Sequence, residues 1–393
     1  MVAPAGHLIE AAPRSGRLRI LYLIDSLGSG GAEHLLAAYL RHLPALGIDP
    51  TVAALQDRGG NPTALAIKAL GIPVLNMGIE RLRQRGAYGD ISGAVDRQSP
   101  DLVHTQLEFS NTLGAPAASR RGIPVVSTLH TLEKPAPWSR AGLRMRLMAR
   151  SLRRHADLVV AVSEHARLHH LEHLRLDPAR VLTIYNGIDV TSFHTGGPDR
   201  AAVRSELGIP AKASLIVVVA VLRPPKGIDR LLRALPAVIE AVPSSHCLIV
   251  GGGEARSGLE HLAADRGLAS RVTFSGTRAD VPRMLAAADL FVLPSLTEAL
   301  PTVVAEAMAA GLPVVATRVG GTPEMIDDST GTLVEPGDIP GLGEAIVHLL
   351  GDSANATSRG SRGKAVAAER FDLATQAARL VDEYRRLTVV RQP

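Results

Sequence analysis

Two glutamates at a fixed spacing are the residues of this chain best suited to chemistry. Glu298 and Glu306 are eight positions apart and flank the segment Ala299-Leu300-Pro301-Thr302-Val303. An apolar run typical of a strand, Leu290–Leu293, precedes them, and we expect a helix to begin at Pro301, a favoured first helical position. A helix start offers N–H groups and a positive dipole end to a phosphate, and carboxylates accept hydrogen bonds from sugar hydroxyls. The pattern indicates a phosphate site flanked by two hydroxyl acceptors, as a nucleotide sugar needs.

The elements that must position these glutamates alternate along the chain. Short runs rich in Val, Ile and Leu alternate with segments of helical spacing, which is typical of parallel sheets covered on both faces. The first series of expected strands is Arg19–Ile24, Thr51–Leu55, Leu102–His104, Val125–Thr128 and Leu158–Val162. The second series is Leu215–Val221, His246–Val250, Val272–Phe274, Leu290–Leu293, Val314–Ala316 and Gly331–Val334.

The two series predict two domains. Open α/β sheets bind ligands beyond the carboxyl ends of their strands, so two such domains that face each other make a site in the cleft between them. We expect a C-terminal helix at about 368–393 to cross back onto the first domain, because no strand follows it. The predicted parts are a tail at 1–16, a Rossmann-like domain at 17–190, a linker at 191–212 and a second Rossmann-like domain at 213–367.

Composition excludes several classes of protein. The 393 residues are 46% hydrophobic but only 3% aromatic, so we expect no base-stacking surface for nucleic acid. The single cysteine, Cys247, lies in an apolar run, which is typical of a core residue in a reducing compartment. The longest apolar run, Leu215–Leu222, is too short to cross a bilayer, and residues 1–16 lack the apolar core of a signal peptide. We therefore expect a cytoplasmic protein.

The positive charge lies in the first half: residues 1–190 hold 22 Lys and Arg against 16 Asp and Glu, whereas the remainder holds 21 against 22, for a formal net charge of +5. This asymmetry suggests an anionic partner for the first domain. A basic amphipathic segment, Trp138–His155, lies there and alternates arginines with leucines and methionines. Two interpretations stay open. The segment is either a packed helix with a solvated face or a peripheral contact with the anionic inner face of a membrane.

A series of motifs occurs along nearly the whole chain, from Ile20 to Arg386. They are Gly28-Ser29-Gly30-Gly31-Ala32-Glu33, His130, Ala161-Val162-Ser163-Glu164, Tyr185-Asn186-Gly187-Ile188-Asp189, Leu222-Arg223-Pro224-Pro225-Lys226-Gly227, Phe274-Ser275-Gly276, the two glutamates and Gly320-Gly321-Thr322-Pro323-Glu324. On these motifs the chain resembles family 4 of the retaining glycosyltransferases. The resemblance implies the α/β GT-B fold, in which two Rossmann-like, doubly wound parallel-sheet domains face each other across a cleft.

The resemblance also assigns roles to residues of the donor side. Lys226 would neutralise the diphosphate as the glycosidic bond breaks, Glu306 would accept from the ribose hydroxyls, and Glu298 would lie near the transferred sugar. Gly30 and Gly31 would approach the donor phosphates closely, because glycine has no Cβ. The predicted donor-binding residues are Gly30, Gly31, Arg223, Lys226, Gly276, Arg278, Glu298, Leu300, Pro301, Thr302, Val303 and Glu306.

On the first domain, the resemblance implies that His130 contacts the donor sugar and the reaction centre. The predicted catalytic residues are thus Lys226, His130 and Glu298. Gln106 and Asn186 would lie on the acceptor side, although formation of a turn explains Asn186 nearly as well. His104 also ends an expected strand, and there a structural role is favoured.

Two departures from the family pattern leave details open. Many members have an arginine five residues before the lysine, where this chain has Val221, and Arg223 is the candidate replacement. Ala299-Leu300 stands where the family often has Gly-Phe, which leaves the donor sugar open. Arg278 would lie near the base or the diphosphate, with a plain surface position as the alternative.

The sequence predicts neither a metal site nor a cofactor. A histidine cluster has helical spacing (His165, His169, His170, His173), but no acidic partner is clearly placed beside it. We predict a retaining, metal-independent hexosyltransferase that moves a sugar from a UDP- or GDP-linked donor to a glycan, lipid-linked or small-molecule acceptor in polysaccharide or glycolipid synthesis. The alternatives are a GT-B nucleotide-sugar epimerase and a non-catalytic two-domain ligand-binding protein.

Overall fold

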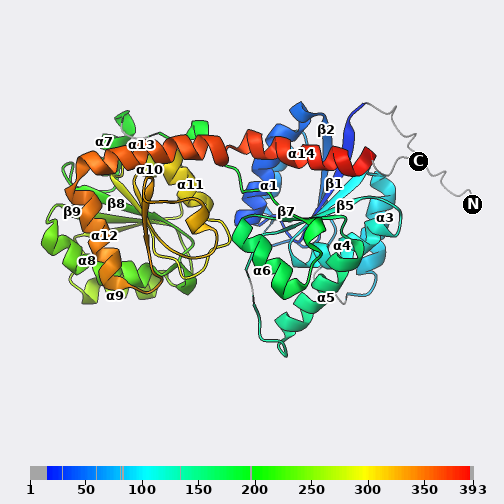
Figure 1. Ribbon diagram of the computed structural model, residues 1–393, viewed down its shortest axis with the longest axis horizontal. Helices are drawn as coiled ribbons and strands as arrows, with labels where there is room; N and C mark the ends of the chain where they lie inside the picture. Colours follow the sequence, from blue (N-terminus) through cyan, green and yellow to red (C-terminus); the bar gives the residue numbers. More distant parts are fainter. Residues whose placement is uncertain are drawn as a thin grey trace, which may run out of the picture.

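The computed structural model contains two parallel β-sheets, one in each half of the chain (Figure 1). The structure describes residues 16–28, 30–58, 60–79, 81, 84–132, 134–194 and 197–389. The first sheet has the strand order β3-β2-β1-β4-β5-β6-β7, and the second has the order β10-β9-β8-β11-β12-β13. Neighbouring strands pair in parallel in both sheets, and helices cover both faces. The prediction of two doubly wound α/β domains is confirmed.

The first sheet and its helices extend from Leu18 to Leu174, with one further strand. The strands are β1 (Leu18–Ile24), β2 (Ile48–Ala54), β3 (Val74–Asn76), β4 (Leu102–Gln106), β5 (Val125–Leu129), β6 (Leu158–Ala161) and β7 (Val181–Thr183). The helices are α1 (Gly31–His42), α2 (Pro62–Ala69), α3 (Ala87–Gln98), α4 (Glu108–Ser119), α5 (Arg140–His155) and α6 (Glu164–Leu174). The sequence did not predict β3 and β7, because three-residue edge strands carry no apolar run of useful length.

The six strands of the second sheet are arranged in the same order as the first six strands of the first sheet. Its strands are β8 (Ser214–Val219), β9 (Ser245–Val250), β10 (Val272–Gly276), β11 (Leu290–Leu293), β12 (Val314–Thr317) and β13 (Gly331–Val334). The helices are α7 (Gly197–Glu206), α8 (Ile228–Ala241), α9 (Arg256–Asp265), α10 (Val281–Ala286), α11 (Thr302–Ala309) and α12 (Ile339–Gly351). Strands β9, β11 and β12 are buried along their whole length, which explains their continuous apolar runs.

The strand order of each sheet reverses at one point, between β1 and β4 in the first sheet and between β8 and β11 in the second. Chain connections leave such a switch point in opposite directions, so a crevice opens there at the carboxyl ends of the strands. The loops that follow β1, β4, β8 and β11 are therefore the ones that the fold places to hold a ligand.

The C-terminal part of the chain forms two helices, α13 (Ser353–Arg370) and α14 (Leu373–Val389), which run along the upper side of both domains (Figure 1). Helix α14 packs against α1 of the first domain. The buried Tyr384 hydroxyl on α14 lies 2.6 Å from His104 Nδ1 and 2.9 Å from the Tyr22 hydroxyl. His104 Nε2 also bonds to Thr128, so His104 has a structural role.

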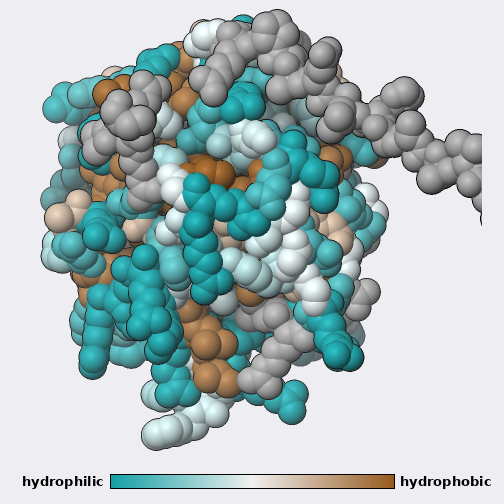
Figure 2. Space-filling view, turned by 90° about the vertical axis from the view of Figure 1, so that its right-hand side faces the viewer, coloured by the Kyte–Doolittle hydropathy of each residue, from teal (hydrophilic) through white to brown (hydrophobic). Residues whose placement is uncertain are grey.

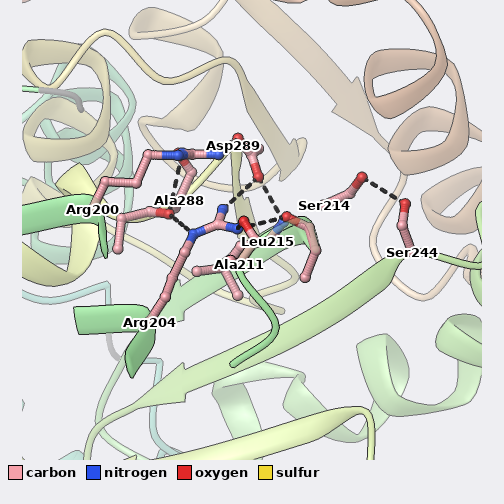
Figure 3. A network of polar contacts seen from close by, with 10 residues as sticks. Arg200, Arg204, Ala211, Ser214, Leu215, Ser244, Ala288 and Asp289 are labelled. Carbon is pink, nitrogen blue, oxygen red and sulfur yellow. Dashed lines mark hydrogen bonds and ion pairs between the residues drawn. The ribbon is translucent and has the colours of Figure 1, made fainter. Parts of the chain in front are cut away.

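Helix α7, in the segment that the sequence predicts as a linker, is tied to the second domain (Figure 3). The guanidinium of Arg204 is buried and donates to the carbonyl oxygens of Ala287, Ala211 and Ala213. It also donates to Asp289 at 2.9 Å, and Arg200 binds the other oxygen of the same carboxylate at 2.6 Å. These contacts place α7 against α10 and the start of β8.

Candidate active site

The clearest polar pair of the second domain joins the loops after β8 and β11. Lys226 ends a short 3₁₀ turn, Pro224–Lys226, and its Nζ lies 2.6 Å from Glu298 Oε1. The Ser295 hydroxyl donates to the same carboxylate oxygen at 2.7 Å. Gly227 has φ of 64°, and a Cβ there would overlap the Pro294 carbonyl oxygen, so only glycine allows this close approach of the two loops.

Lys226 and Glu298 are both partly exposed, and Lys226 has N–H donors left to bind a ligand. The side chain of Lys226 is 23% exposed and that of Glu298 is 9% exposed. The lysine ammonium group has three N–H donors, and its contact with Glu298 uses one of them. An anion that enters here meets a positive charge already oriented by a carboxylate. The prediction placed both residues at the donor, and the structure brings them together.

Glu306 lies on α11, the helix that follows the loop of Glu298. The helix begins at Thr302 rather than at the predicted Pro301, because Pro301 has an extended ψ of 104° and stands as the N-cap. Burial raises the pKa of Glu306 to about 7. No hydrogen-bond partner of the Glu306 carboxylate occurs among the described residues, which leaves its oxygens for a ligand hydroxyl. The first-turn N–H groups of Thr302 and Val303 have no carbonyl partner within the helix.

Three other predicted donor residues have surroundings of their own. Arg278 donates to Asp280 at 2.8 Å and to Glu206 at 2.7 Å, so carboxylates of its own domain engage its guanidinium. Arg223 lines a cavity of about 710 Å³ beside α8 and α9, and neither Lys226 nor Glu298 lines that cavity. Gly276 ends β10 with φ of 74°.

His130 and Gln106 meet at the edge of the first sheet. His130 directly follows β5, and its Nε2 lies 3.2 Å from Gln106 Oε1 at the end of β4. Burial lowers the pKa of His130 to about 4, so the imidazole is neutral at pH 7. In the tautomer that fits this contact, Nε2–H donates to Gln106 and Nδ1 is left as an acceptor.

Asn186 lies at the border of the two domains. Its Nδ2 approaches the carbonyl oxygen of Leu300, another predicted site residue, at 3.5 Å. The structure therefore links this acceptor-side prediction to the segment between the two glutamates of the second domain.

The glycine loop holds a carboxylate of its own. Gly30 is the N-cap of α1 and Gly31 its first residue, whereas Ser29 lies outside the described residues. The side chain of Glu33 folds back over this helix start, so that a Cβ on Gly30 would overlap its carboxylate. Ser26 Oγ donates to Glu33 at 3.3 Å. If a phosphate binds at this helix start, as predicted, the Glu33 side chain must move away or lie beside the phosphate.

A cavity of about 370 Å³ in the first domain reaches His130 and is lined by further polar groups, of which Asp25 was not predicted from the sequence. Asp25 directly follows β1 and accepts from the N–H groups of Phe109 and Ser110, yet burial dominates and raises its pKa to about 6. His170 is buried, and its Nε2 has no hydrogen-bond partner among the described residues. The signal for Asp25 was available, because it is a carboxylate at the carboxyl end of a switch-point strand.

Histidines of α6 contact one another. His169 and His173 stack with ring centroids 4.2 Å apart. Within the part of the chain that the structure describes, no group of three or more His, Cys, Asp or Glu side chains is arranged to hold a metal ion.

Comparisons with known proteins agree with this arrangement. A model of the family described as "Glycosyltransferase Family 4" matches residues 29–192, and one described as "Glycosyl transferases group 1" matches residues 213–352. The D-inositol 3-phosphate glycosyltransferase of Saccharomonospora viridis is 30% identical over 403 residues, which cover 96% of this chain and 86% of that protein. The enzyme of the same name from Mycobacterium tuberculosis strain F11 is 32% identical over 354 residues, 84% of this chain and 67% of that protein.

Solved structures show the same architecture. Anabaena HepE in complex with UDP-glucose superposes with a TM-score of 0.84 at 27% identity, covering 94% of this chain and 100% of that one. WaaG, at 20% identity and a TM-score of 0.74, covers 93% and 99% and shares the fold. Two Rossmann-like domains with this site define a glycosyltransferase of the GT-B fold. The chain belongs to glycosyltransferase family 4, within the group 1 glycosyl transferases.

Proposed function

We propose that this enzyme transfers a sugar from a nucleoside diphosphate sugar to an acceptor hydroxyl with retention of anomeric configuration. The observation that carries the proposal is the Lys226–Glu298 pair at the switch point of the second sheet, with Glu306 nearby on α11. The complexes of HepE with UDP and UDP-glucose support a uridine-linked donor. Relatives that are named as glycosyltransferases argue against the epimerase and binding-protein alternatives.

The proposed chemistry needs three tasks from the second domain. Lys226 stabilises the negative charge that develops on the diphosphate as the bond between the sugar and the phosphate oxygen breaks. Glu298 accepts from hydroxyls of the sugar, and Glu306 accepts from the ribose. The acceptor oxygen bonds to the anomeric carbon on the face that the phosphate leaves, and its proton passes to the departing phosphate oxygen.

His130 serves the same step from the first domain. Because its pKa lies near 4, it is neutral at the pH of the reaction and offers Nδ1 as an acceptor to a sugar hydroxyl. Lys226 supplies the positive charge that a divalent cation supplies in metal-dependent transferases. We therefore infer a metal-independent reaction, and we expect EDTA to leave the transfer rate unchanged.

The cavity of the first domain supports a small polyhydroxylated acceptor. Its lining includes Asp25, Glu33 and Asn111, which accept from or donate to hydroxyl groups, and the arginines Arg58 and Arg144 lie on the same lining. The relatives named D-inositol 3-phosphate glycosyltransferase make a phosphorylated cyclic polyol the first acceptor to test. A glycan or lipid-linked acceptor is the second.

A screen tests the proposal. UDP-glucose, UDP-N-acetylglucosamine and GDP-mannose are each incubated with the enzyme, with and without D-inositol 3-phosphate, and release of the nucleoside diphosphate is followed. We expect turnover of a UDP sugar, and the anomeric coupling constant of the product should equal that of the donor. Absence of binding and turnover for all three donors would contradict the donor class, and an inverted product would contradict retention.

A basic surface supports a peripheral membrane contact of the same enzyme. Trp138 is 92% exposed, and Leu143 and Leu147 on α5 are 40% and 43% exposed. Exposed arginines flank these leucines on the same helix: Arg140, Arg144, Arg146, Arg150, Arg153 and Arg154. Apolar side chains within a basic face fit an anionic lipid surface. Figure 2 shows the side of the first domain, where apolar residues appear among hydrophilic ones.

Vesicle sedimentation tests the membrane contact. We expect the enzyme to sediment with phosphatidylglycerol vesicles and not with phosphatidylcholine vesicles, and Trp138→Ala with Leu147→Glu should remove this binding. Equal recovery of wild type and variant with anionic vesicles would exclude this surface. Among the described residues, none of the helices combines the length and the hydrophobicity needed to cross a bilayer.

A further inference from the structure

One backbone carbonyl receives a hydrogen bond from each domain. The oxygen of Ala299 accepts from Ser163 Oγ of the first domain at 2.8 Å and from Gly321 N of the second domain at 3.1 Å. Ala299 directly follows Glu298, the partner of Lys226. The backbone that carries this carboxylate is therefore held from both sides of the cleft.

A carboxylate of the second domain completes the contact. Glu324, in the turn Thr322–Glu324, accepts from the N–H of Glu164 at 2.8 Å and from that of His165 at 2.7 Å. These are the first two residues of α6, where the helix dipole is positive and the N–H groups have no partner within the helix. Both oxygens of Glu324 are thus engaged by charge-assisted hydrogen bonds.

Two glycines allow the segment 320–324 to lie this close to the loop of Glu298 and to the first domain. Gly320 has φ of 53°, and a Cβ there would overlap the Glu298 carbonyl oxygen. A Cβ on Gly321 would lie 2.8 Å from Ser163 Cβ and 2.5 Å from the Ala299 oxygen. The segment 320–324 is therefore wedged between the start of α6 and the loop that carries Glu298. We call Ser163, Ala299, Gly321 and Glu324 the interdomain link.

The interdomain link lies on the sheet edge that also presents His130. Strands β5 and β6 are neighbours; His130 directly follows β5, and Ser163 lies two residues after β6. The start of α6 consequently has a fixed relation to His130. We propose that Glu324 is a positioning residue for sugar transfer: by binding the start of α6, it holds Glu298 and Lys226 in register with His130 across the cleft.

This proposal rests on the transferase function proposed above and names a residue that acts through others. Glu324 itself is engaged by backbone N–H groups, so it contacts no reacting atom in this arrangement. If Glu324 only stabilised the second domain, its substitution would lower the melting temperature and the nucleotide affinity of that domain together. If Glu324 is a positioning residue, its substitution instead changes how the two domains are oriented, while each domain keeps its own fold and its own binding groups.

The test compares Glu324→Gln with wild type in three measurements. Glutamine has one acceptor oxygen where glutamate has two, so one of the two N–H groups of α6 loses its partner. Small-angle scattering of the ligand-free variant should show a larger radius of gyration than wild type. The affinity for UDP by calorimetry should stay within about twofold, because Lys226 and Glu306 are retained. The single-turnover rate with UDP-glucose and D-inositol 3-phosphate should fall about tenfold, the loss expected for one charge-assisted hydrogen bond.

Glu335→Gln is the matched control, because Glu335 pairs with Arg318 in an exposed ion pair of the same domain. It should change none of the three quantities. Ser163→Ala removes the hydrogen bond from the first domain to the Ala299 oxygen. Its effect on the transfer rate should be less than additive with that of Glu324→Gln, since Ser163 directly precedes the N–H groups that Glu324 binds.

Two results would overturn the proposal. A scattering curve of Glu324→Gln identical to that of wild type would show that the contact does not set the domain geometry. A loss of UDP affinity in parallel with a lower melting temperature would make Glu324 a residue of domain stability alone. The scattering measurement needs no substrate, so its outcome is independent of whether the proposed donor and acceptor are correct.

Discussion

Lys226 Nζ lies 2.6 Å from Glu298 Oε1, although the two residues are 72 positions apart in the chain. The pair forms because β8 and β11 are neighbours at the switch point of the second sheet, so the loops after them meet at one edge. Glycine at position 227 and the hydroxyl of Ser295 bring the lysine and the carboxylate into contact. This relationship is the basis of the role proposed for Lys226, which is to stabilise the departing diphosphate.

Lys226→Ala should lower kcat by about 100-fold or more, because it removes the cation that stabilises the leaving group and leaves Glu298 without its partner. Steady-state transfer with UDP-glucose measures this. The control is Lys212→Ala, which removes an exposed lysine of the same domain and should leave kcat unchanged. A normal kcat in Lys226→Ala would remove Lys226 from the catalytic residues.

Glu306→Gln should weaken UDP binding about tenfold at pH 8, since the amide oxygen accepts ribose hydroxyls less strongly than a carboxylate. Because burial raises the pKa of Glu306 to about 7, the affinity of wild type should rise as pH increases through 7. The affinity of the variant should lose this pH dependence. Calorimetry between pH 5.5 and pH 8.5 measures both proteins, and parallel pH profiles would contradict the assignment.

The same shift has a consequence for stability. The folded state binds the Glu306 proton more tightly than the unfolded state, whose carboxyl has the ordinary pKa of 4.5. The free energy of unfolding should therefore decrease as pH rises from about 4.5 to about 7. In Glu306→Gln this decrease should be smaller, as urea unfolding at pH 5 and pH 7.5 would measure. An identical decrease in both proteins would show that Glu306 titrates normally.

Tyr384→Phe should lower the free energy of unfolding by about 2 to 3 kcal/mol, because it leaves the buried Tyr22 hydroxyl and His104 Nδ1 without their partner. Both contacts attach α14 to the first sheet. The matched control is Tyr88→Phe, whose hydroxyl contacts the Pro116 carbonyl and Arg120 in a partly exposed position. Urea unfolding of both variants measures the difference, and an equal small loss would mean that the crossing helix is held by apolar packing alone.

Arg204→Met should destabilise the second domain by about 3 kcal/mol, because three carbonyl oxygens and one oxygen of Asp289 lose a buried donor. Arg200→Met is the control: Arg200 is 37% exposed at its side chain, and it should cost about 1 kcal/mol or less. Thermal unfolding of the two variants compares them. Equal losses would show that burial of Arg204 adds nothing to the shared ion pair.

Much of the fold was predictable because its signals are local. The strands β9 and β11 are buried along their whole length, so their apolar runs were visible in the sequence. Pro301 was misplaced by one position, because a proline at a helix start fits both the N-cap and the first helical turn, and its ψ decides between them. The short edge strands β3 and β7 owe their conformation to pairing with neighbours, which no local pattern encodes.

The contacts of some residues could not be predicted from the sequence, because their partners come from distant segments. Arg278 follows a strand, as a donor ligand would, yet Glu206 of α7 and Asp280 engage it. Glu324 belonged to a motif without an assigned role, and its partners lie about 160 residues earlier in the chain, at the start of α6. A hydrogen bond between two domains has no signature in the spacing of either partner.

The sequence by itself determined the alternation of strands and helices and the family, and it predicted a site that includes Lys226, Glu298 and Glu306. These depend on residue type and on spacing within one segment, which the chain carries directly. The tertiary structure alone decided that Lys226 meets Glu298, that His104 bonds to Tyr384 and that Glu324 reaches the start of α6. The physical reason is that these contacts depend on strand order and on how the two domains pack, and both arise only when distant segments come together.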